Sequence, residues 1–168
     1  MTHLRLAGVI RESIVDGPGI RLVVFAQGCP HHCPGCHNPN THDPSGGYDS
    51  SVENIIEAVK KNPLLSGVTL SGGDPFAQAP GLAELATEVH ALGLNVVTYT
   101  GYTFEQLLAG AGQQPGWQNL LEQTDILIDG PFLLKEKTLT LPFRGSRNQR
   151  VLDVPASLAQ GRAVEYPL

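Results

Sequence analysis

Three cysteines lie close together in one short segment, and their side chains are the ones in this chain best suited to chemistry. They are Cys29, Cys33 and Cys36, in the spacing C-x3-C-x2-C, and the chain has no fourth cysteine. A closed iron–sulfur or zinc site normally recruits four protein ligands. Three thiolates can instead hold three irons of a [4Fe–4S] cluster and leave the fourth iron open to a substrate. We therefore expect residues 28–39 to form a cluster loop that is the seat of the chemistry.

Two other interpretations of these cysteines remain open. The first is a zinc ion held by the three thiolates and one nearby histidine. The same segment offers His31, His32 and His37. Structural zinc sites usually take two ligands from each of two knuckles, however, and this sequence has no second knuckle. The second interpretation is a redox pair of the C-x-x-C type, Cys33 and Cys36, which leaves Cys29 without a role.

The element that carries the cysteine loop is expected to be a strand. Residues 20–27 (IRLVVFAQ) are apolar and rich in β-branched side chains, and they lead directly into Cys29. The turn-forming run Asp16-Gly17-Pro18-Gly19 precedes them and is interpreted as structural. Other short apolar runs predict further strands at residues 4–10, 67–70, 94–99, 125–128 and 150–154.

Helical patterns separate these strands. Ser50 and Glu53 have the spacing of a capping box before one apolar helical face, and Thr103 and Gln106 have the same spacing before another. Between them, a third helix is expected to stop at Gly93. Strands that alternate with helices predict an α/β fold with a mostly parallel sheet and right-handed crossovers.

Functional residues of such folds gather where the parallel strands end. Besides the cysteine loop, this edge of the predicted sheet receives Gly72, Gly73, Asp74, Thr100 and Asp129. Adjacent glycines allow the backbone to approach a ligand closely, and a carboxylate such as Asp74 could accept hydrogen bonds from an ammonium group. The simpler interpretation of Gly72–Asp74 is a turn that needs a positive φ angle, and Asp129 could equally cap a turn.

Size and composition narrow the class of protein. A chain of 168 residues is expected to form a single domain, 1–168, and its 41% of apolar residues predicts a globular fold. Its net charge of −5 argues against non-specific nucleic-acid binding. No apolar run approaches the length of about 18 residues that spans a membrane, and the N-terminus lacks the features of a signal peptide. Clustered cysteines in an odd number favour the reducing cytoplasm.

Several motifs together resemble the radical S-adenosylmethionine activases of glycyl radical enzymes. These motifs are Asp16-Gly17-Pro18-Gly19-Ile20-Arg21, Phe25, the cysteine loop from Gly28 to Cys36, and Asn38-Pro39. Further runs are similar to the branch that activates anaerobic ribonucleoside-triphosphate reductase. They are Ser71-Gly72-Gly73-Asp74-Pro75, Tyr99-Thr100-Gly101-Tyr102, Leu127-Ile128-Asp129-Gly130, Phe143-Arg144-Gly145-Ser146 and Asn148-Gln149-Arg150. The resemblance covers roughly residues 6–153.

The resemblance implies an incomplete, laterally open (β/α) barrel that binds one [4Fe–4S] cluster and S-adenosylmethionine. A one-electron donor such as a flavodoxin or ferredoxin would reduce the cluster. Reductive cleavage of the cofactor would then give a 5′-deoxyadenosyl radical, which takes a hydrogen atom from a glycine of the reductase partner. The cofactor-binding residues implied are Gly35, Cys36, His37, Gly72, Gly73, Asp74, Thr100 and Asp129.

Two positions depart from the family pattern. Gly35 stands where many radical S-adenosylmethionine proteins have an aromatic or apolar residue, so we expect His37 or a backbone contact to pack against the adenine. Pro131 stands where related activases often carry a basic residue, which leaves the partner of the cofactor's carboxylate group unassigned.

Three alternative functions remain open. They are activation of another glycyl radical enzyme of the pyruvate formate-lyase type, radical chemistry on a small molecule, and electron transfer or binding by a small iron–sulfur or zinc protein. Cofactor cleavage would separate the last of these from the others, and a partner-dependent glycyl radical would exclude the small-molecule reaction.

Overall fold

The computed structural model describes residues 2–36 and 39–167. In these residues, seven strands form one sheet in the order β3-β1-β2-β4-β5-β6-β7. The strands are β1 (His3–Ser13), β2 (Arg21–Ala26), β3 (Tyr48–Ser51), β4 (Gly67–Gly72), β5 (Asn95–Tyr99), β6 (Ile126–Asp129) and β7 (Arg150–Asp153). The sheet is open, because β3 and β7 form its two edges and do not pair with each other.

The sheet is parallel only in its centre. Strands β2, β4, β5 and β6 run parallel, whereas β1, β3 and β7 each pair antiparallel with a neighbour. The expectation of an α/β fold is confirmed, but the last strand turns back instead of crossing over. The segment from β6 to β7 contains only a short 3₁₀ turn, η3 (Leu134–Glu136), and a parallel connection normally needs a full crossover helix. The polar strand β3 was not predicted.

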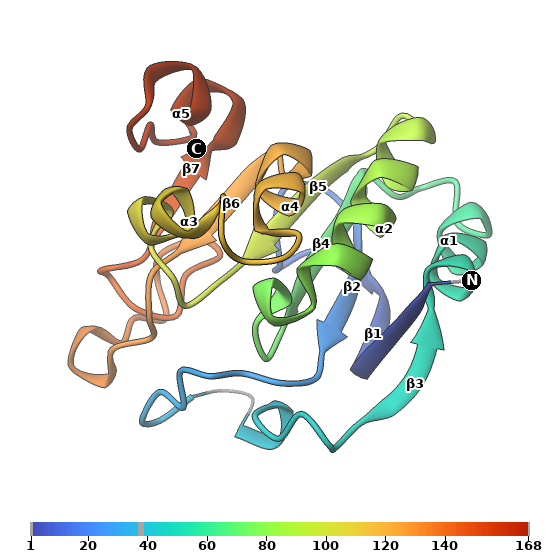
Figure 1. Cartoon of the computed structure of the whole chain (residues 1–168), viewed down its shortest axis with the longest axis horizontal. Coiled ribbons are helices and arrows are strands. Elements are labelled where there is room, and N and C mark those ends of the chain that lie inside the picture. The colour runs from blue at the N-terminus through green and yellow to red at the C-terminus, as the bar shows by residue number, and fades with distance from the viewer. Residues whose placement is uncertain (1, 37–38, 168) are drawn as a thin grey trace.

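Four of the α-helices form a layer on one face of the sheet. They are α1 (Val52–Lys60), α2 (Ala79–Ala91), α3 (Phe104–Gly110) and α4 (Trp117–Gln123), and Figure 1 shows α2 and α4 in front of the central strands, with α1 beside α2. The last helix, α5 (Val154–Gln160), follows β7, and 3₁₀ turns η1 (Pro39–Thr41) and η2 (Pro75–Gln78) follow the cysteine loop and β4. No helix in the described part of the chain is long and apolar enough to cross a bilayer.

Alternation along the strands divides the apolar residues between the two faces. Leu22 and Val24 of β2 join the main core under the helices. The opposite face carries a small cluster, whose buried members are Val97, Ile126, Ile128 and Val151. The helix layer of Figure 1 does not cover that face.

Local signals explain where the helices begin and end. Thr103 and Gln106 form the predicted capping box, and Gly93 has a φ of +80° just beyond α2, where a left-handed residue stops a helix. The first helix differs from the prediction. Its cap is Ser51, which accepts a hydrogen bond from the Asn54 amide at 3.2 Å, because the helix begins at Val52, one residue later than the predicted cap implied.

A buried arginine closes the amino ends of the central strands. Arg21 is fully buried and donates to Thr69 Oγ1 at 2.7 Å, to the Pro18 carbonyl at 2.9 Å and to the Val68 carbonyl at 3.0 Å. Burial lowers the pKa of Arg21 to about 10, so the guanidinium stays charged at neutral pH. The turn that includes Pro18 is therefore structural, as predicted.

A histidine at the same end of the sheet should make the stability of the protein depend on pH. Nδ1 of His90 lies 2.9 Å from Gln123 Oε1, and Nε2 lies 2.7 Å from Asp125 Oδ2. Burial alone would lower the pKa of His90, but the hydrogen bonds with Asp125 and Gln123 outweigh it and raise the pKa above 6.5. The stabilisation should therefore be complete below the unfolded-state pKa and should disappear as the pH rises through the folded-state pKa.

The measurement is urea unfolding of wild type and His90→Gln at several pH values. Gln keeps a donor toward Asp125 but does not titrate, so the difference in unfolding free energy between the two proteins should shrink as the pH rises. We expect this difference in unfolding free energy to be less than about 1 kcal/mol even at low pH, because both partners of the pair are about one third exposed. A difference that does not change with pH would contradict the prediction.

Candidate active site

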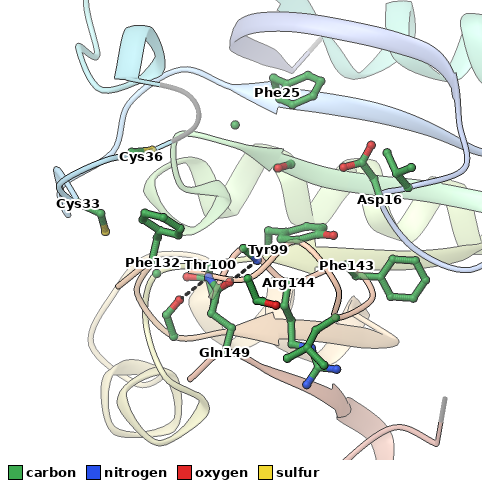
Figure 2. A pocket seen from close by; sticks show the side chains of 18 of the residues that line it. Asp16, Phe25, Cys33, Cys36, Tyr99, Thr100, Phe132, Phe143, Arg144 and Gln149 are labelled. Carbon is green, nitrogen blue, oxygen red and sulfur yellow. Dashed lines mark hydrogen bonds between the residues drawn. The ribbon is translucent and has the colours of Figure 1, made fainter. Parts of the chain in front are cut away.

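A cavity of about 890 Å³ lies on the face of the sheet that the helices leave uncovered. Its volume falls in the range of small-molecule and cofactor sites. Figure 2 shows Cys33 and Cys36 at one end of this cavity and Phe143 and Arg144 at the other, with Tyr99 between them. All three cysteines line it, together with Gly72, Gly73 and Thr100 from the ends of β4 and β5. The structure therefore brings together six of the residues that the sequence singled out.

The cysteine loop leaves the end of β2 and is tied down at its start. The Gly28 amide donates to the Thr41 carbonyl at 2.6 Å, and the Cys29 amide donates to the His42 carbonyl at 3.1 Å. The three cysteines are partly exposed, and none is in a disulfide. Burial raises the pKa of the Cys29 thiol, and the Asp74 carboxylate raises it further, so metal binding must displace a proton there.

The cavity fits an iron–sulfur cluster by the chemistry of its donors. Three thiols line the same cavity, as a three-cysteine cluster requires. His42 also lines the cavity, and its Nε2 is buried without a hydrogen-bond partner among the described residues, so a bound group could supply one. Within residues 2–36 and 39–167, no three Cys, His, Asp or Glu side chains converge closely enough to hold a metal ion. The thiols thus line one cavity but would have to draw together to bind a cluster.

One of the three histidines that could bind zinc, His31, is already hydrogen-bonded to another residue. Nε2 of His31 lies 2.6 Å from Asp74 Oδ2, so this ring nitrogen is already engaged by a carboxylate. His32 packs edge-on against His42, with ring centroids 4.9 Å apart. His37 lies outside the described residues, and its expected contact with the cofactor's adenine stays a prediction. Gly35 is exposed, with a φ of +73°, and packs beside Leu134.

The two glycines at the end of β4 are required by the backbone around them. A Cβ atom on Gly72 would lie 2.4 Å from the Ala26 nitrogen, and one on Gly73 would lie 2.2 Å from the Gly28 oxygen. Gly72 also has a φ of +98°, which favours glycine. The end of β4 and the base of the cysteine loop can therefore lie in direct backbone contact. The turn interpretation and the ligand interpretation of these glycines are compatible, because both residues also line the cavity.

Asp74 is completely buried and joins the ends of two strands. Its carboxylate accepts hydrogen bonds from the Phe76 amide at 3.0 Å, the Gly101 amide at 3.0 Å and Thr100 Oγ1 at 2.9 Å. The carboxylate thus lies behind the cavity wall, because Thr100, one of its donors, lines the cavity and Asp74 does not.

Asp129 faces the opposite side of the sheet. Ile126 and Ile128 belong to the cluster on the cavity face, so the alternation of β6 turns Asp129 toward the helices. There it accepts hydrogen bonds from the Phe104 amide at 2.7 Å and from Arg150 Nε at 3.0 Å. Only its neighbour Gly130 lines the cavity.

The C-terminal motif clamps this strand end. Asn148 Nδ2 donates to the Pro131 carbonyl at 2.8 Å, and Gln149 Nε2 donates to the Gly130 carbonyl at 3.1 Å. Gln149 Oε1 accepts from the Gly145 amide at 2.9 Å, which holds the loop across the cavity (Figure 2). Arg150 completes the clamp through its ion pair with Asp129.

Replacing Arg150 by Met should destabilise the protein by roughly 1.5–3 kcal/mol, because Asp129 is 1% exposed and would lose its charged partner. Arg147→Met is the matched control. Arg147 is 60% exposed and pairs with Glu136 at the surface, so its loss should cost less than about 1 kcal/mol. Chemical unfolding of the two variants measures the difference, and equal effects would show that the buried pair contributes no more than the surface pair.

Several residues of the cavity were not predicted as site residues. They are Asp16, Phe25, Tyr99, Phe132 and Arg144. Phe25 and Tyr99 follow from strand alternation, since each is one residue away from a core position of its strand. Phe132 and Arg144 belong to the long connection after β6, for which the sequence shows no periodic signal.

Comparisons with known proteins agree with this geometry. Residues 15–152 match the family model of a 4Fe-4S single cluster domain. The chain is 34% identical over 146 residues to the anaerobic ribonucleoside-triphosphate reductase-activating protein of Salmonella typhimurium, which covers 82% of this chain and 91% of that protein. It is 35% identical over 144 residues to the protein of the same name from Vibrio cholerae, covering 81% and 89%. A pyruvate formate-lyase-activating enzyme of Listeria monocytogenes is 40% identical over 96 residues, or 54% of this chain and 39% of that enzyme.

Proposed function

This chain belongs to the family of anaerobic ribonucleoside-triphosphate reductase-activating proteins, and we propose that it generates a glycyl radical on such a reductase with the help of S-adenosylmethionine. It is thus an activating enzyme of the glycyl-radical class. The observation that supports the proposal best is the shared cavity, where three cysteines face the glycines at the end of β4 and Thr100 at the end of β5.

We assign the cofactor sites to this cavity. Cys29, Cys33 and Cys36 would hold a [4Fe–4S] cluster, and S-adenosylmethionine would lie along Gly72, Gly73 and Thr100. When bound, the reduced cluster and S-adenosylmethionine supply the electron and the 5′-deoxyadenosyl radical that abstracts a hydrogen atom from the partner's glycine.

The other expected site residues would act around that space. Gly35, Cys36 and His37 would meet the adenine end of the cofactor. Asp74 would act from behind the wall by fixing Thr100, and Asp129 by fixing the turn at Gly130, since neither carboxylate itself lines the cavity.

The open sheet supports a role on a large substrate. Because the edge strands β3 and β7 do not pair with each other, the sheet does not close, and the cavity would admit a peptide loop from the side, as expected for a shortened, laterally open barrel. We propose the glycyl radical subunit as this partner, a flavodoxin or ferredoxin as the electron donor, and the cytoplasm as the location. Neither nucleic acid nor membrane is part of the proposal.

The test is anaerobic reconstitution with iron and sulfide, followed by reduction in the presence of S-adenosylmethionine and the reductase. We expect 5′-deoxyadenosine by chromatography and a glycyl radical signal on the reductase by electron paramagnetic resonance. Persistent absence of both, with a competent reductant, would defeat the proposal.

Pyruvate formate-lyase is the second candidate target, because the Listeria activase matches over part of this chain. Supplying each partner in turn distinguishes the two. A radical formed on pyruvate formate-lyase alone would favour this candidate over the reductase.

A basic segment beside the cavity is a candidate for docking the partner. Residues 133–147 contain four basic residues and one acidic residue, in a chain with 11 Lys and Arg against 16 Asp and Glu. An acidic partner surface would be attracted to this segment. Arg147→Glu should therefore lower the affinity for the reductase roughly tenfold at low salt, while cofactor cleavage without partner stays unchanged.

The control is Arg162→Glu, which makes the same charge change at an exposed position after α5. Binding would be measured by titration and cleavage by the release of 5′-deoxyadenosine. Equal loss of binding in both variants would point to net charge alone, and loss of cleavage in Arg147→Glu would place Arg147 in the fold or the cofactor site.

A further inference from the structure

His31 links the middle of the cysteine loop to the strand-end carboxylate Asp74. Nε2 of His31 lies 2.6 Å from Asp74 Oδ2, and the two side chains are 17% and 0% exposed. An ionised carboxylate only accepts hydrogen bonds, so Nε2 is the nitrogen that donates. Because Asp74 is already held by Thr100 Oγ1 and the Gly101 amide, this bond ties the loop to a fixed point.

Neighbouring residues also pack closely around the imidazole ring. It meets the ring of Tyr102 edge-on, with centroids 4.4 Å apart. Gly101 also lies against the ring, since a Cβ atom at this position would come within 2.5 Å of His31 Cδ2. The absence of a side chain at position 101 therefore leaves the room that the ring occupies. Hydrogen bond, aromatic contact and glycine together fix both the position and the orientation of the ring.

We infer that His31 is a positioning residue, which holds the cysteine loop at a set place relative to the ends of β4 and β5. This inference rests on the proposed function, because its consequence concerns the cofactor. The thiols belong to the loop, whereas Gly72, Gly73 and Thr100 belong to the strand ends. A loop free to shift would separate the two halves of the site, and a small displacement is costly to reactions that depend on geometry.

The experiment compares four variants with wild type. His31→Ala removes both contacts, His31→Phe keeps a ring without a donor, and His31→Gln keeps a donor that can reach Asp74. His32→Ala is the matched control, because His32 is the neighbouring exposed histidine and contacts His42 instead. Each protein is reconstituted anaerobically and assayed for iron and sulfide. The reduced protein is then titrated with S-adenosylmethionine, and the change in its electron paramagnetic resonance spectrum reports binding.

We expect every variant to take up iron and sulfide like wild type, since all three cysteines remain. His31→Ala and His31→Phe should bind S-adenosylmethionine at least about tenfold more weakly, as is typical when an orienting hydrogen bond beside a metal site is lost. His31→Gln should recover most of the affinity, and His32→Ala should match wild type.

Wild-type affinity in His31→Ala would overturn the inference while the proposed function stands. Failure of all three His31 variants to take up iron would also overturn it, because His31 would then serve the assembly of the loop. Failure of wild type to cleave S-adenosylmethionine would instead defeat the proposed function, and the inference with it.

Discussion

Replacing any one of Cys29, Cys33 and Cys36 by alanine will lower reductive cleavage of S-adenosylmethionine by at least about two orders of magnitude. With only three cysteines in the chain, no spare thiolate can take over the lost position. The fold should survive, because all three side chains are partly exposed and lie in a loop outside the core. The measurement is 5′-deoxyadenosine formed by the reconstituted, reduced protein.

Thermal unfolding of the metal-free variants is the control for this experiment. It should differ from wild type by no more than about 0.5 kcal/mol, as for ordinary surface substitutions. Stoichiometric zinc without iron in protein purified anaerobically from iron-replete cells, together with no cluster on reconstitution, would contradict the assignment of these cysteines.

Replacing Gly73 by Val will have the second large effect. The new Cβ would meet the Gly28 oxygen at 2.2 Å and the Thr41 oxygen at 2.9 Å, and both are backbone atoms that cannot rotate away. The base of the cysteine loop must therefore move away from β4. Such a displacement of the cysteine loop relative to the cofactor can lower the cleavage rate about 100-fold. Overpacking should also lower the free energy of unfolding by about 1–3 kcal/mol.

Gly112→Val is the matched control, because a Cβ atom at this exposed turn would meet nothing within 4 Å. It should cleave S-adenosylmethionine like wild type. If Gly73→Val assembles its cluster and binds and cleaves the cofactor normally, the methionine end of S-adenosylmethionine lies elsewhere in the cavity.

The site residues whose place could be predicted are placed by local sequence patterns. Strand 20–27 was recognisable from its apolar, β-branched run, and the cysteine loop had to begin where that strand ends. Gly72, Gly73 and Thr100 follow strands of the same kind, and parallel neighbours bring their ends to one edge. These positions line the cavity, and their contact with the cofactor stays a prediction.

Other parts of the site depend on contacts between distant segments. His31 and Asp74 are 43 positions apart, and no pattern in either segment indicates that they pair. Ser51, not Ser50, caps α1, because β3 pairs with β1 through Ser51 and the helix begins only at Val52. Residues 131–149 lack a periodic pattern, so their path across the cavity was not predictable.

What the sequence alone determined is the set of groups available for chemistry and the local elements that carry them. Three cysteines in one loop, the capping box at Thr103 and the stop at Gly93 each depend on residues a few positions apart. The tertiary structure alone decided on which face of the sheet each group lies. Asp129 ends a strand as predicted, but the register of β6 turns it toward Arg150 and away from the cavity. The physical reason is that a strand alternates its side chains between two faces, and only packing against the rest of the chain selects which face becomes the site.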